Sequence, residues 1–179
     1  YNACLDALKT KFGSAVAPIV VPVLDGDKKV VGIVDLLHNK AYEVKGGKTV
    51  ACAIPDAVAD DVETLRAELM EAAAGADEEL MEKFFETMEL TPAEIAKGLK
   101  VGVREGTVAP VLCGAALSGL GVEMLLETIV ELVPVASDMP AEKAEDEDGN
   151  ALEVAHDPAG ATAAIVFKTV SDQYGKYSL

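Results

Sequence analysis

A run of small residues follows a short apolar segment near position 113. Residues 108–113 read Val-Ala-Pro-Val-Leu-Cys, and Gly114, Ala115 and Ala116 come directly after them. Small side chains leave the backbone N–H groups of a loop accessible, so this loop could donate hydrogen bonds to a carbonyl oxygen such as the O6 of guanine. Small residues after a buried strand are also common for packing alone, and the pattern by itself favours that interpretation.

A second group of candidate residues is acidic. Residues 56–89 hold twelve acidic side chains against Arg66 and Lys83. An acidic helix face attracts a basic partner and speeds its encounter, whereas a solvated outer face is the alternative that the charges alone favour. The candidates recur at helical spacing on a face distinct from the apolar stripe: Glu68, Glu71, Glu78 and Glu82.

Residues for other kinds of chemistry are missing from the sequence. The motif G-x-x-x-x-G-K-[ST], which cradles phosphates and positions Mg²⁺, is absent. Asn39-Lys40 begins like the guanine-specifying N-K-x-D, but Tyr42 occupies the Asp position. The Cys residues lack C-x-x-C spacing, and neither His has a second ligand at metal-binding spacing. We therefore predict no catalytic residue and no metal site in this chain.

Composition narrows the class of protein further. The 179 residues include 31 acidic against 15 basic side chains, a formal charge of −16, which repels phosphate backbones and predicts no DNA binding. No apolar run approaches the ~20 residues of a membrane span, and no signal-peptide pattern opens the chain, so we expect no membrane association and a cytoplasmic location. Tyr1 at the start and the short run 176–179 at the end predict that both ends are cut.

The first half of the chain is predicted to pass from a helix to a set of strands. Apolar residues at helical spacing predict a helix over 2–12. Pro18 and Pro22 favour an edge or irregular position for the first strand, and Gly46-Gly47 favours a turn between the last two. The predicted strands are residues 16–24, 30–37, 40–44 and 49–54.

Helices dominate the second half until the chain becomes acidic. An apolar stripe predicts a helix over 58–88, in which Gly75 either makes a kink or ends the helix, with Asp77 capping a second one. Thr91-Pro92-Ala93-Glu94 is typical of a helix start. A strand over 108–113 and a helix over 122–133 form half of a parallel α/β unit. Residues 161–170 read as a further strand, followed by a turn and a partner strand.

Seven segments in this order resemble elongation factor G, a translational GTPase. They are PIVVPV, VVGIVDLLHNKAYEV, IPD, EAAAGADEELMEKF, ELTPAEI, VAPVLCGAALSGLGVEMLLETIVELVP and AAIVFKTVSDQYGK. The resemblance covers essentially the whole chain, from just after the guanine-specifying motif to the first strands of the second domain.

The resemblance implies an α/β fold with an α+β insert. A partial P-loop GTPase sheet would carry an inserted mixed β and helical subdomain and be followed by the first strands of a β-barrel. The implied layout is a GTPase-domain helix at 1–15, the insert at 16–107, the last strand and helix of the GTPase domain at 108–137, an acidic linker at 138–160, and the start of β-barrel domain II at 161–179.

The resemblance also implies roles for the candidate residues. Cys113, Gly114, Ala115 and Ala116 match the family's guanine-binding loop, usually C-G-S-A, in which Ala116 would donate its N–H to guanine. The insert's helix would supply acids for the basic mobile domain of the ribosomal stalk protein. Glu71 and Glu78 match such positions, while Gly75 stands where a third acid is expected.

The leading hypothesis is therefore a fragment of a GTPase that drives ribosomal translocation. GTP and Mg²⁺ would bind the full-length protein, and the fragment alone would bind neither and be inactive. Ala115 in place of Ser, together with Gly75, motivates the alternative of a G-like paralogue in ribosome recycling. A standalone acidic interaction module is the hypothesis from another class. We also expect apolar surface exposed on residues 108–133, through which the fragment would self-associate.

Overall fold

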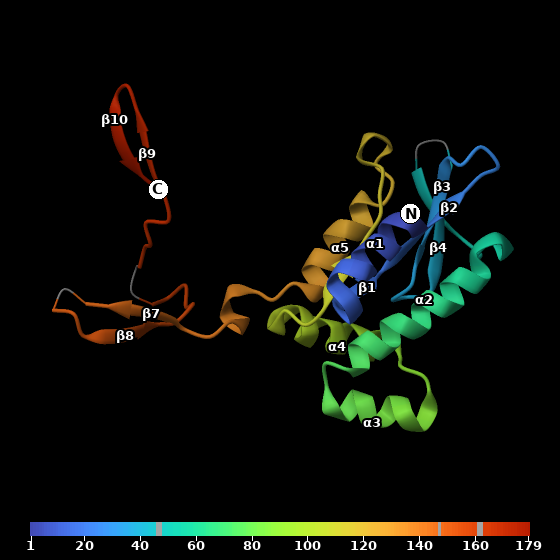
Figure 1. The fold of residues 1–179 in the computed structure, drawn as a ribbon, viewed down its shortest axis with the longest axis horizontal. Coiled ribbons are helices and arrows are strands. Elements are labelled where there is room, and N and C mark those ends of the chain that lie inside the picture. The colour runs from blue at the N-terminus through green and yellow to red at the C-terminus, as the bar shows by residue number, and fades with distance from the viewer. Residues whose placement is uncertain (46–47, 147, 161–162) are drawn as a thin grey trace. The chain divides into compact units, whose positions relative to one another are not determined.

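The computed structural model describes residues 1–45, 48–146, 148–160 and 163–179, which divide into two compact units, Tyr1–Pro134 and Val135–Leu179 (Figure 1). The chain is of mixed α/β type, as predicted, with several small sheets and five α-helices in the described part. All eight candidate residues lie in the first unit, so its architecture decides how they are positioned.

The largest sheet of the first unit is antiparallel, with the strand order β2-β3-β4-β5. β2 lies at the edge of the sheet, where the missing N–H of Pro22 breaks no ladder between central strands, which confirms the predicted edge position. The turn predicted at Gly46-Gly47 lies outside the described residues. The four strands are β2 (Val20–Leu24), β3 (Val30–Asp35), β4 (Lys40–Lys45) and β5 (Lys48–Cys52).

The strand predicted over residues 16–24 is two strands that belong to different sheets. β1 (Val16–Pro18) pairs in parallel with β6 (Ala109–Val111), whereas β2 pairs with β3. Ile19 lies between them: its N–H donates to the Val111 carbonyl at 2.8 Å, and its own carbonyl accepts from the Leu36 N–H at 2.9 Å. A continuous apolar run gives no sign of this change of partner.

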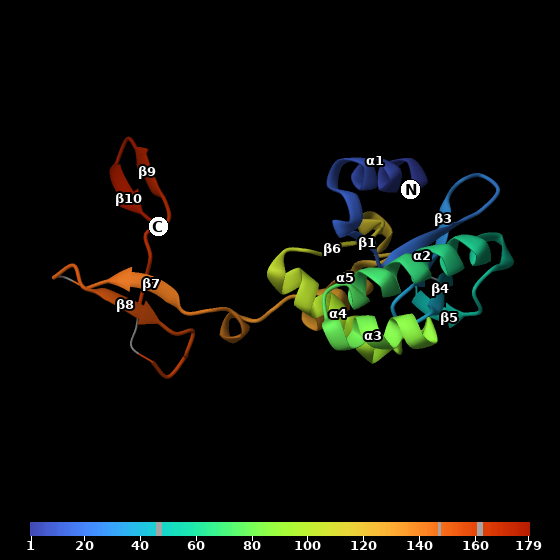
Figure 2. The ribbon, with the colours of Figure 1, turned by 60° about the horizontal axis from the view of Figure 1, so that its bottom comes forward.

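Helices α2 and α4 form the centre of the helical layer. α2 contacts both α3 and α4, and α4 contacts α5; Figure 2 shows α3 beside α4. The crossing of α2 and α4 is close, because a Cβ added at Gly98 would lie 2.2 Å from the carbonyl oxygen of Ala73. Leu69, Ile95 and Leu99 are fully buried there. The helices are α1 (Asn2–Phe12), α2 (Asp56–Ala74), α3 (Glu78–Thr87), α4 (Pro92–Glu105) and α5 (Val122–Leu132).

Helix α5 has one buried and one exposed apolar face. Met124, Thr128 and Leu132 are buried, at the i, i+4, i+8 spacing of a single helix face. On the other side Leu126 is 59% exposed and Val130 is 85% exposed, with Val122, Leu125, Ile129 and Val133 also exposed. The prediction of exposed apolar surface on this helix is confirmed.

In the described residues of the second unit there are two hairpins and a short 3-10 helix, η3 (Ala136–Asp138). β7 (Glu142–Glu145) pairs with β8 (Ala151–Val154) inside the segment predicted as a linker, and Asp146 closes the turn by accepting the N–H groups of Asp148 and Asn150. β9 (Thr169–Asp172) pairs with β10 (Gly175–Ser178), as the predicted turn required. The strand predicted from residue 161 begins only at Thr169. Residues 163–168 have no regular structure, and residues 161–162 lie outside the described part.

Candidate functional site

The four candidate glutamates lie on two helices rather than one. α2 ends at Ala74, and Asp77 starts α3 by accepting the Leu80 N–H at 3.1 Å. Of the two alternatives for Gly75, the structure therefore has the end of a helix. Glu68 and Glu71 are exposed on α2, and Glu78 and Glu82 are exposed on α3.

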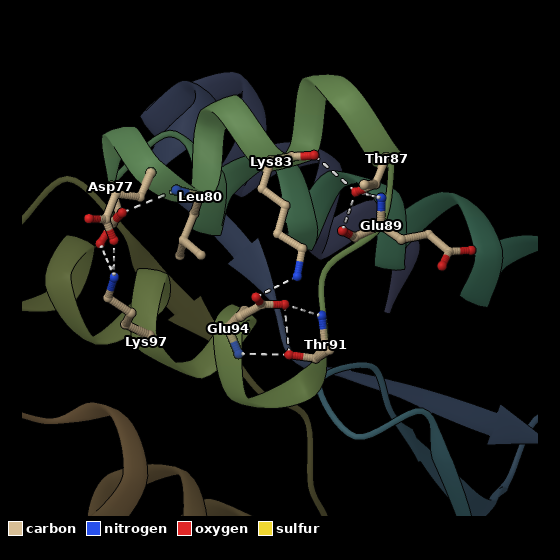
Figure 3. A network of polar contacts seen from close by, with 9 residues as sticks. Asp77, Leu80, Lys83, Thr87, Glu89, Thr91, Glu94 and Lys97 are labelled. Atoms are coloured by element: carbon tan, nitrogen blue, oxygen red, sulfur yellow. Dashed lines mark hydrogen bonds and ion pairs between the residues drawn. The ribbon is translucent and has the colours of Figure 1, made fainter.

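A polar network fixes α3 on α4 (Figure 3). At one end of α3, Lys97 of α4 lies 2.9 Å from Asp77 and 3.4 Å from Glu79. Further along, Lys83 of α3 lies 2.5 Å from Glu94 of α4. Between these contacts the Leu80 side chain is buried. Ion pairs at two points and an apolar contact between them hold the helix that carries Glu78 and Glu82 in one orientation.

The start of α4 has the predicted capping box. The Thr91 hydroxyl accepts the Glu94 N–H, and the Glu94 carboxylate accepts the Thr91 N–H at 2.9 Å. The hydrogen bond from Lys83, followed by those from Thr91, lowers the pKa of Glu94 to about 2. Lys97, with help from the Leu80 N–H, likewise holds the pKa of Asp77 below its usual value. Both carboxylates are ionised over the neutral range and keep the network intact.

Glu68 and Glu71 differ in how far their charges are compensated. Lys9 of α1 lies 2.5 Å from Glu68, whereas no ion pair reaches Glu71 in the described part of the chain. An open groove of about 580 Å³ lies beside them, and its lining includes Ser14, Met81 and Thr107. Glu71 is therefore the α2 candidate with a free charge, and Glu68 also ties α1 to α2.

The predicted guanine loop closes into a compact turn after β6. The Ala115 N–H donates to the Leu120 carbonyl at 2.9 Å, and the Ser118 hydroxyl donates to the Ala115 carbonyl at 3.0 Å. Gly121 is needed where the loop returns, because its φ is +79° and an added Cβ would lie 2.8 Å from the Cys113 carbonyl oxygen. The Ser118 hydroxyl thus braces a loop that has Ala at position 115.

Ala116 and Cys113 have different surroundings in this loop. Ala116 begins the 3-10 helix η2 (Ala116–Ser118) and is exposed, so its N–H, the first of a helical turn, has no acceptor within that turn. The Cys113 sulfur lies 3.7 Å from the Val20 carbonyl, and burial raises the pKa of the thiol to about 11. Ala116 is available as a donor, whereas Cys113 is a neutral packing residue and no nucleophile.

Sequence reasoning missed a polar cluster at the end of β3. The buried Asp35 carboxylate lies 2.6 Å from His38 Nδ1 and accepts the Leu37 N–H at 2.9 Å. Arg66 of α2 donates to the carbonyls of Leu36 and Leu37. These contacts fix the turn between β3 and β4 on α2. The spacing of Asp and His, three residues apart before Asn39-Lys40, was the available signal.

Metal binding and membrane crossing have no candidates among the described residues. None of these residues form a group of three or more His, Cys, Asp or Glu side chains that could hold a metal ion. None of the helices in the described ranges is both long and apolar enough to pass through a membrane.

Comparison with known proteins shows that the chain is similar to part of a longer protein. No family model matches the sequence. A crystal structure of a protein from Thermus thermophilus is similar over 100% of this chain, with a TM-score of 0.70 and 26% sequence identity. The chain spans 28% of that protein's length. It is therefore similar in fold and sequence to a segment of a longer bacterial protein.

Proposed function

We propose that this chain is part of a translational GTPase similar to elongation factor G, and that residues 16–107 form an insert that binds the basic domain of a ribosomal stalk protein. The observation that carries this proposal is the acidic surface of α2 and α3, held rigidly by the network between α3 and α4. A surface with a fixed shape and uncompensated charge attracts a basic protein without a large ordering cost. The full-length protein would act in the cytoplasm on the ribosome.

The path of the backbone supports an insert but moves its start from residue 16 to residue 19, because Val16–Pro18 pair with β6 and not with the sheet of the insert. β1 precedes residues 19–108 and β6 follows them, and the two strands pair in parallel, with Val16 opposite Ala109. A long segment that leaves and returns to neighbouring parallel strands has the connectivity of an insertion into a sheet. Parallel sheets are normally covered by helices on both faces and contain several strands. The exposed apolar face of α5 therefore fits a helix of a larger GTPase sheet, and the hairpin β9–β10 fits the start of the β-barrel domain.

The loop after β6 would bind guanine in the full-length protein. Ala116 is exposed and its N–H begins η2, and the neighbouring Gly114 and Ala115 have small side chains. The phosphates and Mg²⁺ require a G-x-x-x-x-G-K-[ST] motif, which this sequence lacks. GTP and Mg²⁺ are thus proposed for the full-length protein, and this chain by itself is proposed to bind neither.

Translocation of the ribosome is the proposed activity of the full-length protein, and ribosome recycling by a G-like paralogue is the second candidate. The departure that favours the second is Ala115 in a loop where the family has Ser. A translocation assay on the full-length protein separates them, because activity at the level of an ordinary factor would reject the paralogue.

Titration by NMR tests the stalk contact. We expect amide shifts in the ¹⁵N-labelled chain to cluster on α2 and α3 when the basic stalk domain is added, and to be lost in Glu71→Lys and Glu78→Lys. Glu153→Lys, on exposed β8, makes the same charge change in the second unit and is the control. Equal binding by all three variants would reject the proposed contact.

Restoring the acid expected at position 75 gives a complementary test. Gly75 has a helical φ of −61°, and a Cβ placed there would be 3.4 Å from the nearest atom, so Gly75→Glu fits without strain. We expect the added charge to strengthen stalk binding about two- to threefold at low salt, as one exposed charge does. An unchanged affinity would place position 75 outside the contact.

A further inference from the structure

Helix α3 exposes an aromatic side chain on its solvent face. Phe85 is 73% exposed, whereas Leu80 on the face toward α4 is buried. Glu82 and Glu78 precede Phe85 by three and seven residues, which places them beside it on the same face. Met88, three residues further on, is 64% exposed. The outer side of α3 is therefore an apolar centre next to carboxylates.

The charges around Phe85 are uncompensated. Lys83, the one basic residue of α3, is held by Glu94, and the nearby Lys97 is held by Asp77 and Glu79. Among the described residues, no ion pair reaches Glu78, Glu82 or Glu86. Both basic groups thus form their ion pairs between α3 and α4, whereas Glu78, Glu82 and Glu86 are exposed to solvent.

This arrangement has the anatomy of a protein-binding surface. Binding energy at interfaces concentrates in aromatic anchors near the centre of the contact, with a polar rim around them. Phe85 contributes little to the core, since most of its surface is in water. The network of Figure 3 holds α3 in place before any partner arrives, which lowers the entropic cost of binding.

We propose that this outer face of α3 is a docking surface on which Phe85 enters an apolar pocket rimmed by Lys or Arg side chains of the partner. The face consists of Glu78, Glu82, Phe85 and Glu86. The carboxylates of the face select the occupant: the same acidic face of a second copy and the phosphates of nucleic acid would both be repelled. A basic protein domain is the complement. The inference rests on the proposed function, since the basic stalk domain is taken as that partner.

Calorimetric titration of the whole chain with the basic stalk domain, at about 50 and 200 mM salt, tests the inference. Phe85→Ala should weaken binding tenfold or more at both salt concentrations, as removal of an aromatic anchor does. Glu82→Gln should weaken it several-fold at low salt and reduce the salt dependence. Because both side chains are exposed, thermal unfolding should be nearly unchanged.

The control is Phe167→Ala, which removes a Phe of similar exposure, 77%, from the second unit. If Glu71→Lys and Glu78→Lys reduce binding but Phe85→Ala equals Phe167→Ala, the aromatic anchor is rejected and the stalk contact stands. If the unmodified chain does not bind the stalk domain at either salt concentration, the proposed function is rejected and this inference with it. If Phe85→Ala loses binding to the stalk domain and Phe167→Ala does not, the role of Phe85 as the aromatic anchor is supported.

Discussion

Helices α3 and α5 are similar in length and both amphipathic, yet the surfaces that they expose to solvent differ in chemistry: the surface of α3 is acidic and the surface of α5 is apolar. α3 turns Leu80 inward, is fastened by ion pairs, and shows carboxylates around one Phe. α5 turns Met124 and Leu132 inward and shows a row of Leu, Ile and Val. The first surface suits a partner that binds reversibly. The second has the composition of a core, and in our account the rest of a GTPase sheet covers it.

The largest expected effect contrasts the same substitution at a buried position of α4 and on the exposed face of α5. Leu99→Ala removes a fully buried side chain of α4 and should lower the free energy of unfolding by about 2–5 kcal/mol. Leu126→Ala on the exposed face of α5 should change it by less than about 0.5 kcal/mol. Denaturant unfolding of both variants checks this. The unfolding is measured at dilutions where the chain is monomeric, and equal losses there would mean that the α5 face is covered within the monomer.

Self-association is the next test of the difference. Each Leu or Val side chain removed from water contributes about 1.5–3 kcal/mol, so the exposed face of α5 should drive association of the chain despite its charge. Leu126→Glu with Val130→Glu should shift the association at least tenfold toward monomer in light scattering. The matched pair Glu82→Leu with Glu86→Leu on α3 should increase association. A clean monomer of the unmodified chain at all concentrations would contradict the prediction.

Removal of the cap of α4 should have a smaller effect. Thr91→Ala deletes the hydroxyl that accepts the Glu94 N–H and should cost about 1 kcal/mol of stability. Thr91→Ser keeps the hydroxyl and should restore most of it, which equilibrium unfolding measures. If Ala and Ser behave alike, the capping box contributes nothing to holding α3 on α4.

The smallest expected effect is on the way the stability of the fold falls at acidic pH. The pKa of Glu94 is lowered to about 2 in the folded chain, from 4.5. A depressed folded pKa means that Glu94 stabilises the fold fully above pH 4.5 and loses this contribution as the pH falls toward 2. Glu94→Gln should therefore flatten the acid limb of the stability curve between these values, whereas Glu86→Gln should leave it unchanged. If the stability of Glu94→Gln and that of the unmodified chain changed with pH in the same way, the ion pair of Glu94 would not stabilise the fold.

The sequence predicted the local structure better than the arrangement of its parts. The helix over 2–12, the capping box at Thr91 and the hairpin turn after Asp172 depend on neighbouring residues, and each was predicted correctly. The division of residues 16–24 between two sheets depends on Val111 and Leu36, which are far away in the chain. The hairpin at 142–154 was missed because β7 is mostly Glu and Lys and further acids follow it, a composition typical of a solvated linker.

The candidate site divides in the same way. Spacing alone identified the four glutamates, but not that Glu68 is held by Lys9 or that Lys83 and Lys97 form ion pairs between α3 and α4. Those pairs form between residues distant in sequence, and nothing local indicates them. Phe85 was not singled out from the sequence, and only the structure shows that this side chain of α3 is 73% exposed.

The measurement that tests the central claim most directly is nucleotide binding by the full reading frame that contains this chain, compared with the chain alone. Fluorescent GTP is titrated into both in the presence of Mg²⁺. We predict binding by the full-length protein, reduced by Ala116→Pro, which removes the donor N–H of the loop after β6, and no binding by the 179-residue chain. GTP binding by the chain alone, or a full-length protein that lacks G-x-x-x-x-G-K-[ST] and does not bind GTP, would contradict the account.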